Sequence, residues 1–269
     1  MIKEEQRPVA YMGLVQLGQT YMQIALDMYG GTLCGLGFDK KIYCESIYNL
    51  YLPDEPEDGR LRLGVSYLTE VPGELENISL AANSVCGTNF GLIYCKVAIL
   101  DNEVWAGVQG ILEDITITTY LMCGISKYIV YCSPLSTGPD GQSNVWIPNW
   151  KIKRTKLQST SQVLTFKSFT HNGIQACGIN LRNTLYCTDN ISPNQQDTDA
   201  DAMFNRKGIT NVSQVVMSIT HTCFMRNGKT VCISANKYVV IDKPYSTINI
   251  YKNMLIGMLG TAIEYTRLE

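Results

Sequence analysis

The two histidines are the first candidates for acid–base chemistry, because the ordinary pKa of histidine lies close to neutral pH. His171 stands in HNGIQAC and His221 in THTC, each on the segment that leads into a cysteine-bearing hairpin. A histidine that packs in the core or binds a turn explains these positions better than a general base does. A cysteine nucleophile is disfavoured too, because all ten cysteines belong to repeated pairs. We therefore expect no enzyme activity and no catalytic residue.

Alternating carboxylates at Asp197, Asp199 and Asp201 in DTDADA have the spacing of a calcium-binding loop. The run lacks the glycine and the distal glutamate that complete such a loop. A solvated insert is the preferred interpretation, and calcium is the alternative. We expect no cofactor and no resident metal.

Aromatic and basic residues gather in the insert GPDGQSNVWIPNWKIKRTK, residues 138–156. Tryptophan faces stack on sugar rings, and cations bind phosphate or sulfate. The structural alternative is a strand whose tryptophans cover the core while its basic residues face water. The candidate ligand-binding residues are Trp105, Trp146, Trp150, Lys151, Lys153 and Arg154.

The ten cysteines stand at the ends of five similar segments, and a sixth segment keeps the glycine and tyrosine of the others without the cysteines. The six copies are CGLGFDKKIYC (34–44), CGTNFGLIYC (86–95), CGISKYIVYC (123–132), CGINLRNTLYC (177–187), CFMRNGKTVC (223–232) and IGMLGTAIEY (256–265).

Asn227-Gly228 sets the register of the fifth copy, because this dipeptide readily adopts the two positive φ angles of a type I′ hairpin turn. Counting outward from the turn places Cys223 opposite Cys232. The cysteines then fall on a non-hydrogen-bonded pair, where side chains approach most closely. Phe90-Gly91 and Lys127-Tyr128 give the same register in two other copies, and the two longer copies need a three-residue loop.

The register predicts one cross-strand disulfide in each cysteine-bearing hairpin. Structural zinc is disfavoured, because zinc ligands come in closely spaced pairs and the chain has only two histidines. The predicted disulfides are Cys34–Cys44, Cys86–Cys95, Cys123–Cys132, Cys177–Cys187 and Cys223–Cys232. The same register sets Tyr94 against Gly87 and Tyr131 against Gly124, where a ring can cover the glycine backbone.

Alternating apolar residues upstream of the hairpins, as in WAGVQGILEDITITTYLMCG (105–124), predict a further strand before the hairpin. The hairpins start 52, 37, 54, 46 and 33 residues apart, a period typical of propeller blades. We predict an all-β fold with one domain over residues 1–269, a six-bladed β-propeller with antiparallel blades. Pairing of the N-terminal segment 9–26 with the C-terminal hairpin would close the ring.

The repeat resembles that of the tectonin and tachylectin family of lectins, including the fish-egg lectins, whose blades read Trp, Val, Pro-Gly, Leu, Ile and then a hairpin ending in Ile-Tyr. The best matches run from Val71-Pro72-Gly73 to Tyr94 and from Trp105 to Tyr131. The chain departs from the family where cysteines stand in place of the Trp before Gly, at Cys86, Cys123 and Cys177. This resemblance implies recognition of cell-surface or microbial glycans, as in innate immunity.

A second resemblance is to the repeats of the regulator of chromosome condensation, whose cysteine-containing variants have His-Thr-Cys before a turn and Val-Tyr-Cys after it. His221-Thr222-Cys223 to Val231-Cys232 fits that pattern. The Trp-Gly expected after the second cysteine is missing. This resemblance also implies a propeller, but one that binds other proteins.

Charge, cysteines and sequons bear on the compartment and the partners. A net charge of −2 favours neither nucleic acid nor an anionic membrane, and the longest apolar run, residues 253–263, is too short for a membrane span. No signal peptide is recognised in MIKEEQRPVA. The paired cysteines and three sequons, at Asn77, Asn190 and Asn211, favour an oxidising compartment, either extracellular or a secretory granule.

We therefore predict a carbohydrate-binding, lectin-like protein that recognises glycans or lipopolysaccharide through sites repeated around the propeller. The alternative is a protein-docking propeller of the chromosome-condensation type that belongs to a larger assembly. Competition by free saccharide would distinguish the two, because only the lectin would lose its ligand.

Overall fold

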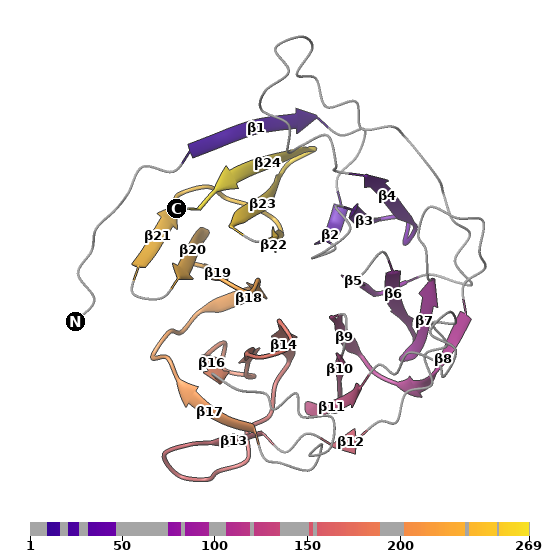
Figure 1. The fold of residues 1–269 in the computed structure, drawn as a ribbon, viewed down its shortest axis with the longest axis vertical. Coiled ribbons are helices and arrows are strands. Elements are labelled where there is room, and N and C mark those ends of the chain that lie inside the picture. The colour runs from indigo at the N-terminus through magenta and orange to yellow at the C-terminus, as the bar shows by residue number, and fades with distance from the viewer. Residues whose placement is uncertain are drawn as a thin grey trace.

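The computed structural model describes residues 10–16, 21–26, 32–46, 75–81, 84–96, 106–118, 121–134, 151–152, 155–188, 202–234, 237–251 and 253–268. The regular elements of these residues are all β-strands, and they form six sheets. Viewed down the shortest axis of the molecule, the sheets radiate around a centre where one strand of each sheet lies innermost (Figure 1). The prediction of an all-β propeller is confirmed.

We number the sheets as blades 1 to 6 in chain order of their innermost strands. Blade 1 contains β2 (Tyr21–Leu26), β3 (Thr32–Gly37) and β4 (Ile42–Ser46); blade 2 contains β5 (Asn77–Ala81), β6 (Ser84–Asn89), β7 (Leu92–Lys96) and β8 (Ala106–Ile111); blade 3 contains β9 (Asp114–Ile117), β10 (Leu121–Ser126), β11 (Ile129–Pro134) and β12 (Lys151–Ile152). Blade 4 contains β14 (Ser168–His171), β15 (Ala176–Ile179), β16 (Leu185–Thr188), β17 (Ala202–Arg206) and β13 (Thr155–Leu157); blade 5 contains β18 (Val212–Met217), β19 (Thr222–Arg226), β20 (Lys229–Ser234) and β21 (Lys237–Ile241); blade 6 contains β22 (Ile248–Tyr251), β23 (Met254–Leu259), β24 (Ala262–Arg267) and β1 (Ala10–Gln16).

The blades follow one another in space as they do in sequence. Innermost strands of successive blades are in contact, and β22 of blade 6 contacts β2 of blade 1. The outer strand of blade 6 is β1, which pairs antiparallel with β24 (Figure 1). The C-terminal hairpin thus takes its last strand from residues 10–16, whereas residues 21–26 of the same predicted segment form β2 and pair with β3 in blade 1.

The register of the hairpins is the predicted one. Each pair of predicted cysteines lies directly opposite across two strands, and all five disulfides are present with Cα atoms 4.0 to 4.1 Å apart. This separation is that of non-hydrogen-bonded antiparallel pairs, which lie about 4.5 Å apart. No cysteine is free.

The hairpin turns also follow the prediction. Asn227 and Gly228 both have positive φ angles, 50° and 75°, as a type I′ turn requires. The longer hairpin of blade 1 has a three-residue loop that ends in a left-handed residue, Lys40, with φ of 63°. Blade 4 repeats this arrangement with Asn183.

Two features of the sheets differ from the prediction. The residues before the third hairpin form two strands, of which β8 completes blade 2 and only β9 begins blade 3. The blades are antiparallel except in blade 4, where the added outer strand β13 pairs parallel with β17. The strands β8 and β13 are both edge strands, and each pairs with a strand of another sequence repeat. The alternation of apolar residues within each segment therefore does not predict its pairing.

The disulfides lie in the apolar cores between blades. Cys34 and Cys44 of blade 1 pack with Leu75 and Ile78 of blade 2, and the same arrangement recurs at the next four junctions. At the sixth junction Ile256 and Tyr265 of blade 6 take the place of the cysteines. Each disulfide therefore stabilises both its own hairpin and the surface that buries the next blade.

The glycine after the first cysteine is covered differently from the prediction. Tyr94 does lie opposite Gly87, but the side chain closest to a Cβ added at Gly87 is that of Leu75, twelve residues upstream. Phe166 covers Gly178 in the same way. The covering side chain comes from the start of the same blade's innermost strand and not from across the hairpin.

Candidate functional site

Side chains on the innermost strands join each blade to the next. The amide of Gln23 in blade 1 accepts a hydrogen bond from the backbone N–H of Ile78 in blade 2 and donates one to its carbonyl, both at 2.9 Å. Gln214 holds Ile248 of blade 6 in the same way, at 3.0 and 3.1 Å. These clamps provide partners for backbone groups at the inner edges of blades 2 and 6.

Other junctions use shorter side chains for the same purpose. Asn77 of blade 2 donates to the carbonyl of Glu113 at 2.7 Å, and Asn249 of blade 6 donates to the carbonyl of Ile24 at 3.0 Å. The hydroxyl of Ser79 accepts a hydrogen bond from Ile117 N–H at 3.0 Å. The polar residues of the inner strands are thus used to tie the ring together.

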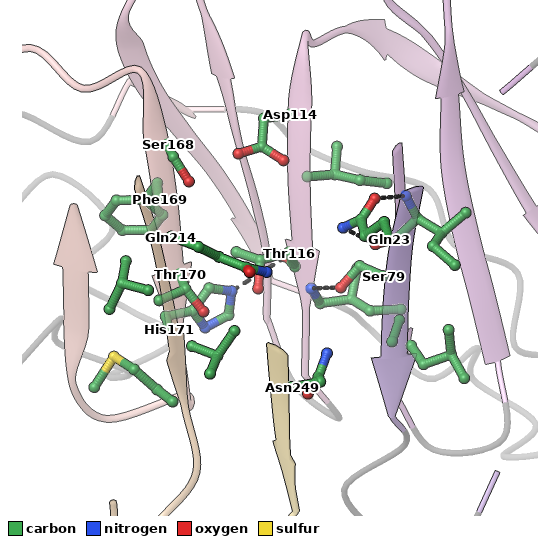
Figure 2. A pocket seen from close by; sticks show the side chains of 18 of the residues that line it. Gln23, Ser79, Asp114, Thr116, Ser168, Phe169, Thr170, His171, Gln214 and Asn249 are labelled. Atoms are coloured by element: carbon green, nitrogen blue, oxygen red, sulfur yellow. Dashed lines mark hydrogen bonds between the residues drawn. The ribbon is translucent and has the colours of Figure 1, made fainter. Parts of the chain in front are cut away.

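A polar cavity of about 120 Å³ lies between the inner strands, with residues of all six blades in its wall. Figure 2 shows the side chains that converge on it, among them Asp114, His171 and Gln214. The cavity is large enough for a few water molecules or a small polar solute. Its two titratable side chains come from adjacent blades.

Asp114 has the same position in blade 3 as Gln23 has in blade 1 and Gln214 has in blade 5. Each of the three directly precedes the residue that lies opposite the position after the first hairpin cysteine. Its carboxyl faces the backbone amide of Phe169 in blade 4. Burial raises the pKa of Asp114 to about 7, and hydrogen bonds from the backbone of Phe169 and Ile115 oppose that rise. A neutral carboxylic acid offers one donor and one acceptor, as a glutamine amide does.

His171 is a buried member of the same wall. Its Nε2 lies 3.2 Å from the carbonyl oxygen of Thr116 in blade 3, so this nitrogen carries the proton and donates it. Burial lowers the pKa of His171 to about 4, although the hydrogen bond to Thr116 acts in the opposite direction. His171 is therefore a neutral side chain that joins two blades, which agrees with the packed histidine preferred from the sequence.

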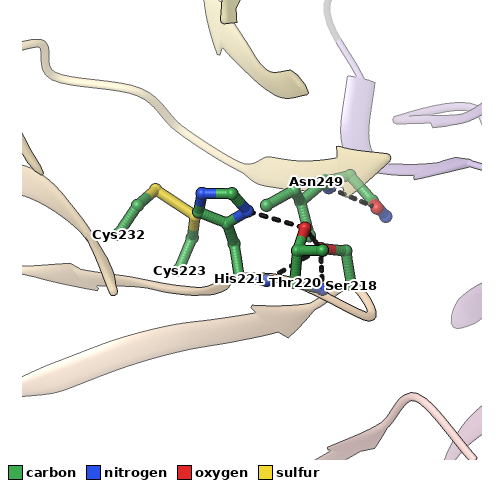
Figure 3. The surroundings of a disulfide bond; sticks show 7 residues. Ser218, Thr220, His221, Cys223, Cys232 and Asn249 are labelled. Carbon is green, nitrogen blue, oxygen red and sulfur yellow. Dashed lines mark hydrogen bonds between the residues drawn. A yellow bond between two sulfur atoms is a disulfide. The ribbon is translucent and has the colours of Figure 1, made fainter. Parts of the chain in front are cut away.

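His221 lies in the turn between β18 and β19, next to the disulfide Cys223–Cys232 (Figure 3). Its Nδ1 is 2.8 Å from the hydroxyl of Thr220, and the Ser218 hydroxyl accepts the backbone N–H of His221 at 3.1 Å. This is the turn-binding histidine expected from the sequence. Both contacts are local interactions within the turn.

The hairpin tips of blades 1 to 4 each form a hydrogen bond with the blade that follows. The left-handed residue that ends a turn presents its carbonyl to the following blade, where a backbone N–H binds it. The bonds run from Leu75 to Lys40, from Leu112 to Gly91, from Phe166 to Tyr128 and from Val212 to Asn183. Since successive tips take part in the same kind of bond, the tips of blades 1 to 4 lie on the same face.

Large apolar side chains are exposed at these four tips, which we call the tip face. Phe90 of blade 2 is 84% exposed and Phe38 of blade 1 is 68% exposed. Tyr128 and Ile129 project from blade 3, and Leu181 projects from blade 4. The tip of blade 5, Asn227-Gly228, carries no apolar side chain, so the apolar residues are concentrated over blades 1 to 4.

Most ligand-binding residues predicted from the sequence lie outside the described residues, namely Trp105, Trp146, Trp150, Lys153 and Arg154, and so do Asp197, Asp199, Asp201 and Asn190. Lys151 is in β12, at the outer edge of blade 3. Of the two sequons in the described residues, that of Asn211 is exposed and that of Asn77 is buried. The assignment of the tryptophans and basic residues to a ligand site stays a prediction.

Within the described residues, no three side chains of histidine, cysteine, aspartate or glutamate are arranged to hold a metal ion. The same ranges contain no helix that could serve as a membrane span.

Sequence reasoning missed both the clamps and the tip face. A signal for the clamps exists, because Gln23, Asp114 and Gln214 each precede the apolar residue that faces the hairpin glycine position. The signal for the tip face was an aromatic residue in a turn that favours Asn or Gly.

Comparison with known proteins identifies the fold without identifying a family. No family model and no curated protein sequence matches the chain. The structure is similar to that of U3-55K, with a TM-score of 0.54 and 9% identity over 91% of this chain and 80% of the other. It is also similar to the crystal structure of Kap60 bound to yeast RCC1 (Prp20), with a TM-score of 0.50 and 8% identity over 87% of this chain and 66% of that chain.

These likenesses support a β-propeller fold, which both resemblances found in the sequence imply. At such low identities they show the fold alone. The chain spans slightly less than two thirds of the length of the matched chain in the Kap60 complex. The tectonin resemblance stays a prediction.

Proposed function

We propose that this protein is a non-enzymatic, protein-docking propeller that binds its partner through the tip face. The exposure of Phe90 is the observation that carries the proposal. An L-amino acid with a Cβ in the left-handed region costs about 1–2 kcal/mol, and Phe90 combines this conformation, with φ of 47°, with 84% exposure. Neither property contributes to the fold, so a role in binding explains the residue better.

Blade 5 provides an internal comparison. Its tip has the same type I′ geometry but uses Asn227 and Gly228, the residues that this turn favours. The left-handed backbone at Phe90 and Tyr128 is thus required by the turn, whereas the aromatic side chains are not. Aromatic residues are enriched among the residues that dominate protein–protein binding energies.

The shape of the tip face also favours a macromolecular partner. Phe38, Phe90, Tyr128 and Leu181 stand on separate projecting turns, and a small ligand could not contact them all in one pocket. An apolar surface that spans several blades is typical of docking sites for proteins. The matched RCC1 (Prp20) structure, which contains Kap60, is an example of a propeller in complex with another protein.

Competition by free saccharide is the test of the lectin hypothesis. Its tryptophans lie outside the described residues. The five disulfides indicate an oxidising compartment. We propose that the partner is met there, outside the cell or in a secretory granule.

Site-specific photocrosslinking tests the proposed function. A photoreactive phenylalanine would replace Phe90 in one variant and Ile219 in the other; Ile219 is 60% exposed in the turn between β18 and β19, away from the tip face. We expect a discrete protein adduct from position 90 in the fluid or cells that contain the protein, unaffected by free saccharide. Equal adducts from both positions, or loss of the position 90 adduct with saccharide, would contradict the proposal.

A further inference from the structure

The sequon Asn211-Val212-Ser213 lies at the start of β18, on the loop that enters blade 5. Asn211 and Ser213 are exposed, whereas Val212 between them is fully buried. The backbone of Asn211 is left-handed, with φ of 61°, and the N–H of Val212 is held by the carbonyl of Asn183 at 3.0 Å. Asn211 and Ser213 are therefore both accessible on a fixed backbone, with the Ser213 hydroxyl donating a long hydrogen bond of 3.5 Å to the carbonyl of Met225.

The sequon Asn77-Ile78-Ser79 has the opposite surroundings. Asn77 is only 9% exposed, and its Nδ2 donates to the carbonyl of Glu113 in the next blade at 2.7 Å. The Ser79 hydroxyl accepts the N–H of Ile117. A sugar on Nδ2 of Asn77 would have to occupy the packed junction between blades 2 and 3.

We propose that Asn211 is an acceptor of an N-linked glycan and that Asn77 is not. The donor is a lipid-pyrophosphate-linked oligosaccharide. The Asn211 Nδ2 forms a bond to the anomeric carbon and loses a proton, while the bond from that carbon to the pyrophosphate breaks and the lipid pyrophosphate leaves. The reaction requires passage through a secretory pathway, with which the five disulfides agree.

The position of the glycan restricts the docking surface. The bond from Val212 to Asn183 places Asn211 beside the tip of blade 4, near Leu181. A glycan there would cover the border between blades 4 and 5 and leave Phe38, Phe90 and Tyr128 free. This consequence rests on the proposed function, whereas the modification itself does not.

Site occupancy decides the assignment. The full chain, preceded by a secretory signal, would be expressed in eukaryotic cells, and the secreted, disulfide-bonded protein would be treated with a glycosidase in ¹⁸O water, which converts glycosylated Asn to labelled Asp. We expect the label at Asn211 and none at Asn77. An unlabelled Asn211 in secreted protein, or a labelled Asn77 in folded protein, would overturn the proposal.

Two variants give an independent check. Asn211→Asp and Ser213→Ala both remove the sequon at exposed positions, and aspartate, like asparagine, is accepted in the left-handed backbone of position 211. Both variants should therefore be secreted normally, and on an electrophoresis gel both should lack the glycan of the unsubstituted protein. If either variant is poorly secreted, the label at Asn211 in the unsubstituted protein still decides the assignment. Loss of binding at the tip face would leave the occupancy result unchanged, so the two proposals can fail separately.

Discussion

The backbone N–H of Phe166 in blade 4 donates a hydrogen bond of 3.1 Å to the carbonyl oxygen of Tyr128 at the tip of blade 3. The left-handed conformation of Tyr128, with φ of 66°, directs this carbonyl toward the next blade. The backbone of the tip therefore binds the neighbouring blade, whereas the side chain of Tyr128 is exposed to solvent. Side-chain substitutions at the tips can test binding while the junction between blades is retained.

Phe90→Asn should separate stability from binding. The substitution gives blade 2 the Asn-Gly turn of blade 5, and relief of the left-handed strain should raise the free energy of unfolding by about 1 kcal/mol. Affinity for the crosslinked partner should fall about tenfold or more, because an aromatic anchor is lost. Urea unfolding and a binding titration measure the two effects.

Asn227→Phe is the matched control for that substitution. It introduces the same strained aromatic residue into the blade 5 tip, so stability should fall by about 1 kcal/mol while binding to the partner stays unchanged. A parallel fall in affinity would mean that binding follows stability and not the surface at Phe90.

The local parts of the structure were predictable from the sequence. The pairing of Cys223 with Cys232 follows from the Asn227-Gly228 turn, because a two-residue hairpin fixes the register of both strands. The disulfides and the repeat were therefore predicted correctly. The disulfides join cysteines only 9 or 10 positions apart, a distance over which turn chemistry dominates.

The parts that join repeats were not predictable by the same reasoning. The pairing of β13 with β17 and the clamp from Gln214 to Ile248 depend on which segments lie side by side in the ring. Asp114 illustrates the difficulty, since an acidic residue in an alternating strand indicates a solvent-facing position. The backbone amide that this carboxyl binds belongs to Phe169 in the next blade, and the sequence around Asp114 does not predict that contact.

Asp114→Asn should change how stability depends on pH. The pKa of Asp114 rises from 3.8 to about 7 on folding, so the folded state favours the protonated acid. Its contribution to stability is complete below about pH 4 and is lost as the pH rises through 7. The asparagine variant lacks this loss, and its melting temperature should exceed that of the unsubstituted protein by more at pH 8 than at pH 5. A constant difference between the two proteins would contradict the assignment.

His171→Gln should act in the opposite direction. The pKa of His171 falls from 6.5 to about 4 on folding, so its contribution to stability is present above pH 6.5 and is lost as the pH falls toward 4. Glutamine can still donate to the Thr116 carbonyl but cannot titrate. Melting curves should therefore show that the unsubstituted protein loses more stability than the variant between pH 7 and pH 4.5.

Gly178→Ala should destabilise the protein through Phe166. An added Cβ would overlap the Phe166 ring, which cannot move away easily because it packs against Phe204 with ring centroids 5.1 Å apart. Overpacking of this kind costs about 1–3 kcal/mol. Blade 5 shows the alternative solution, since Phe224 follows the first cysteine there and the smaller Val212 occupies the position of Phe166.

Double substitution tests whether the two positions act as one unit. Phe166→Val alone should cost about 2–4 kcal/mol through the cavity that it leaves. In the Gly178→Ala, Phe166→Val protein the added methyl group no longer meets the ring, so the free energies of unfolding should show a favourable coupling of about 1 kcal/mol or more. Strictly additive effects would mean that the strain at Gly178 comes from its backbone and not from the ring of Phe166.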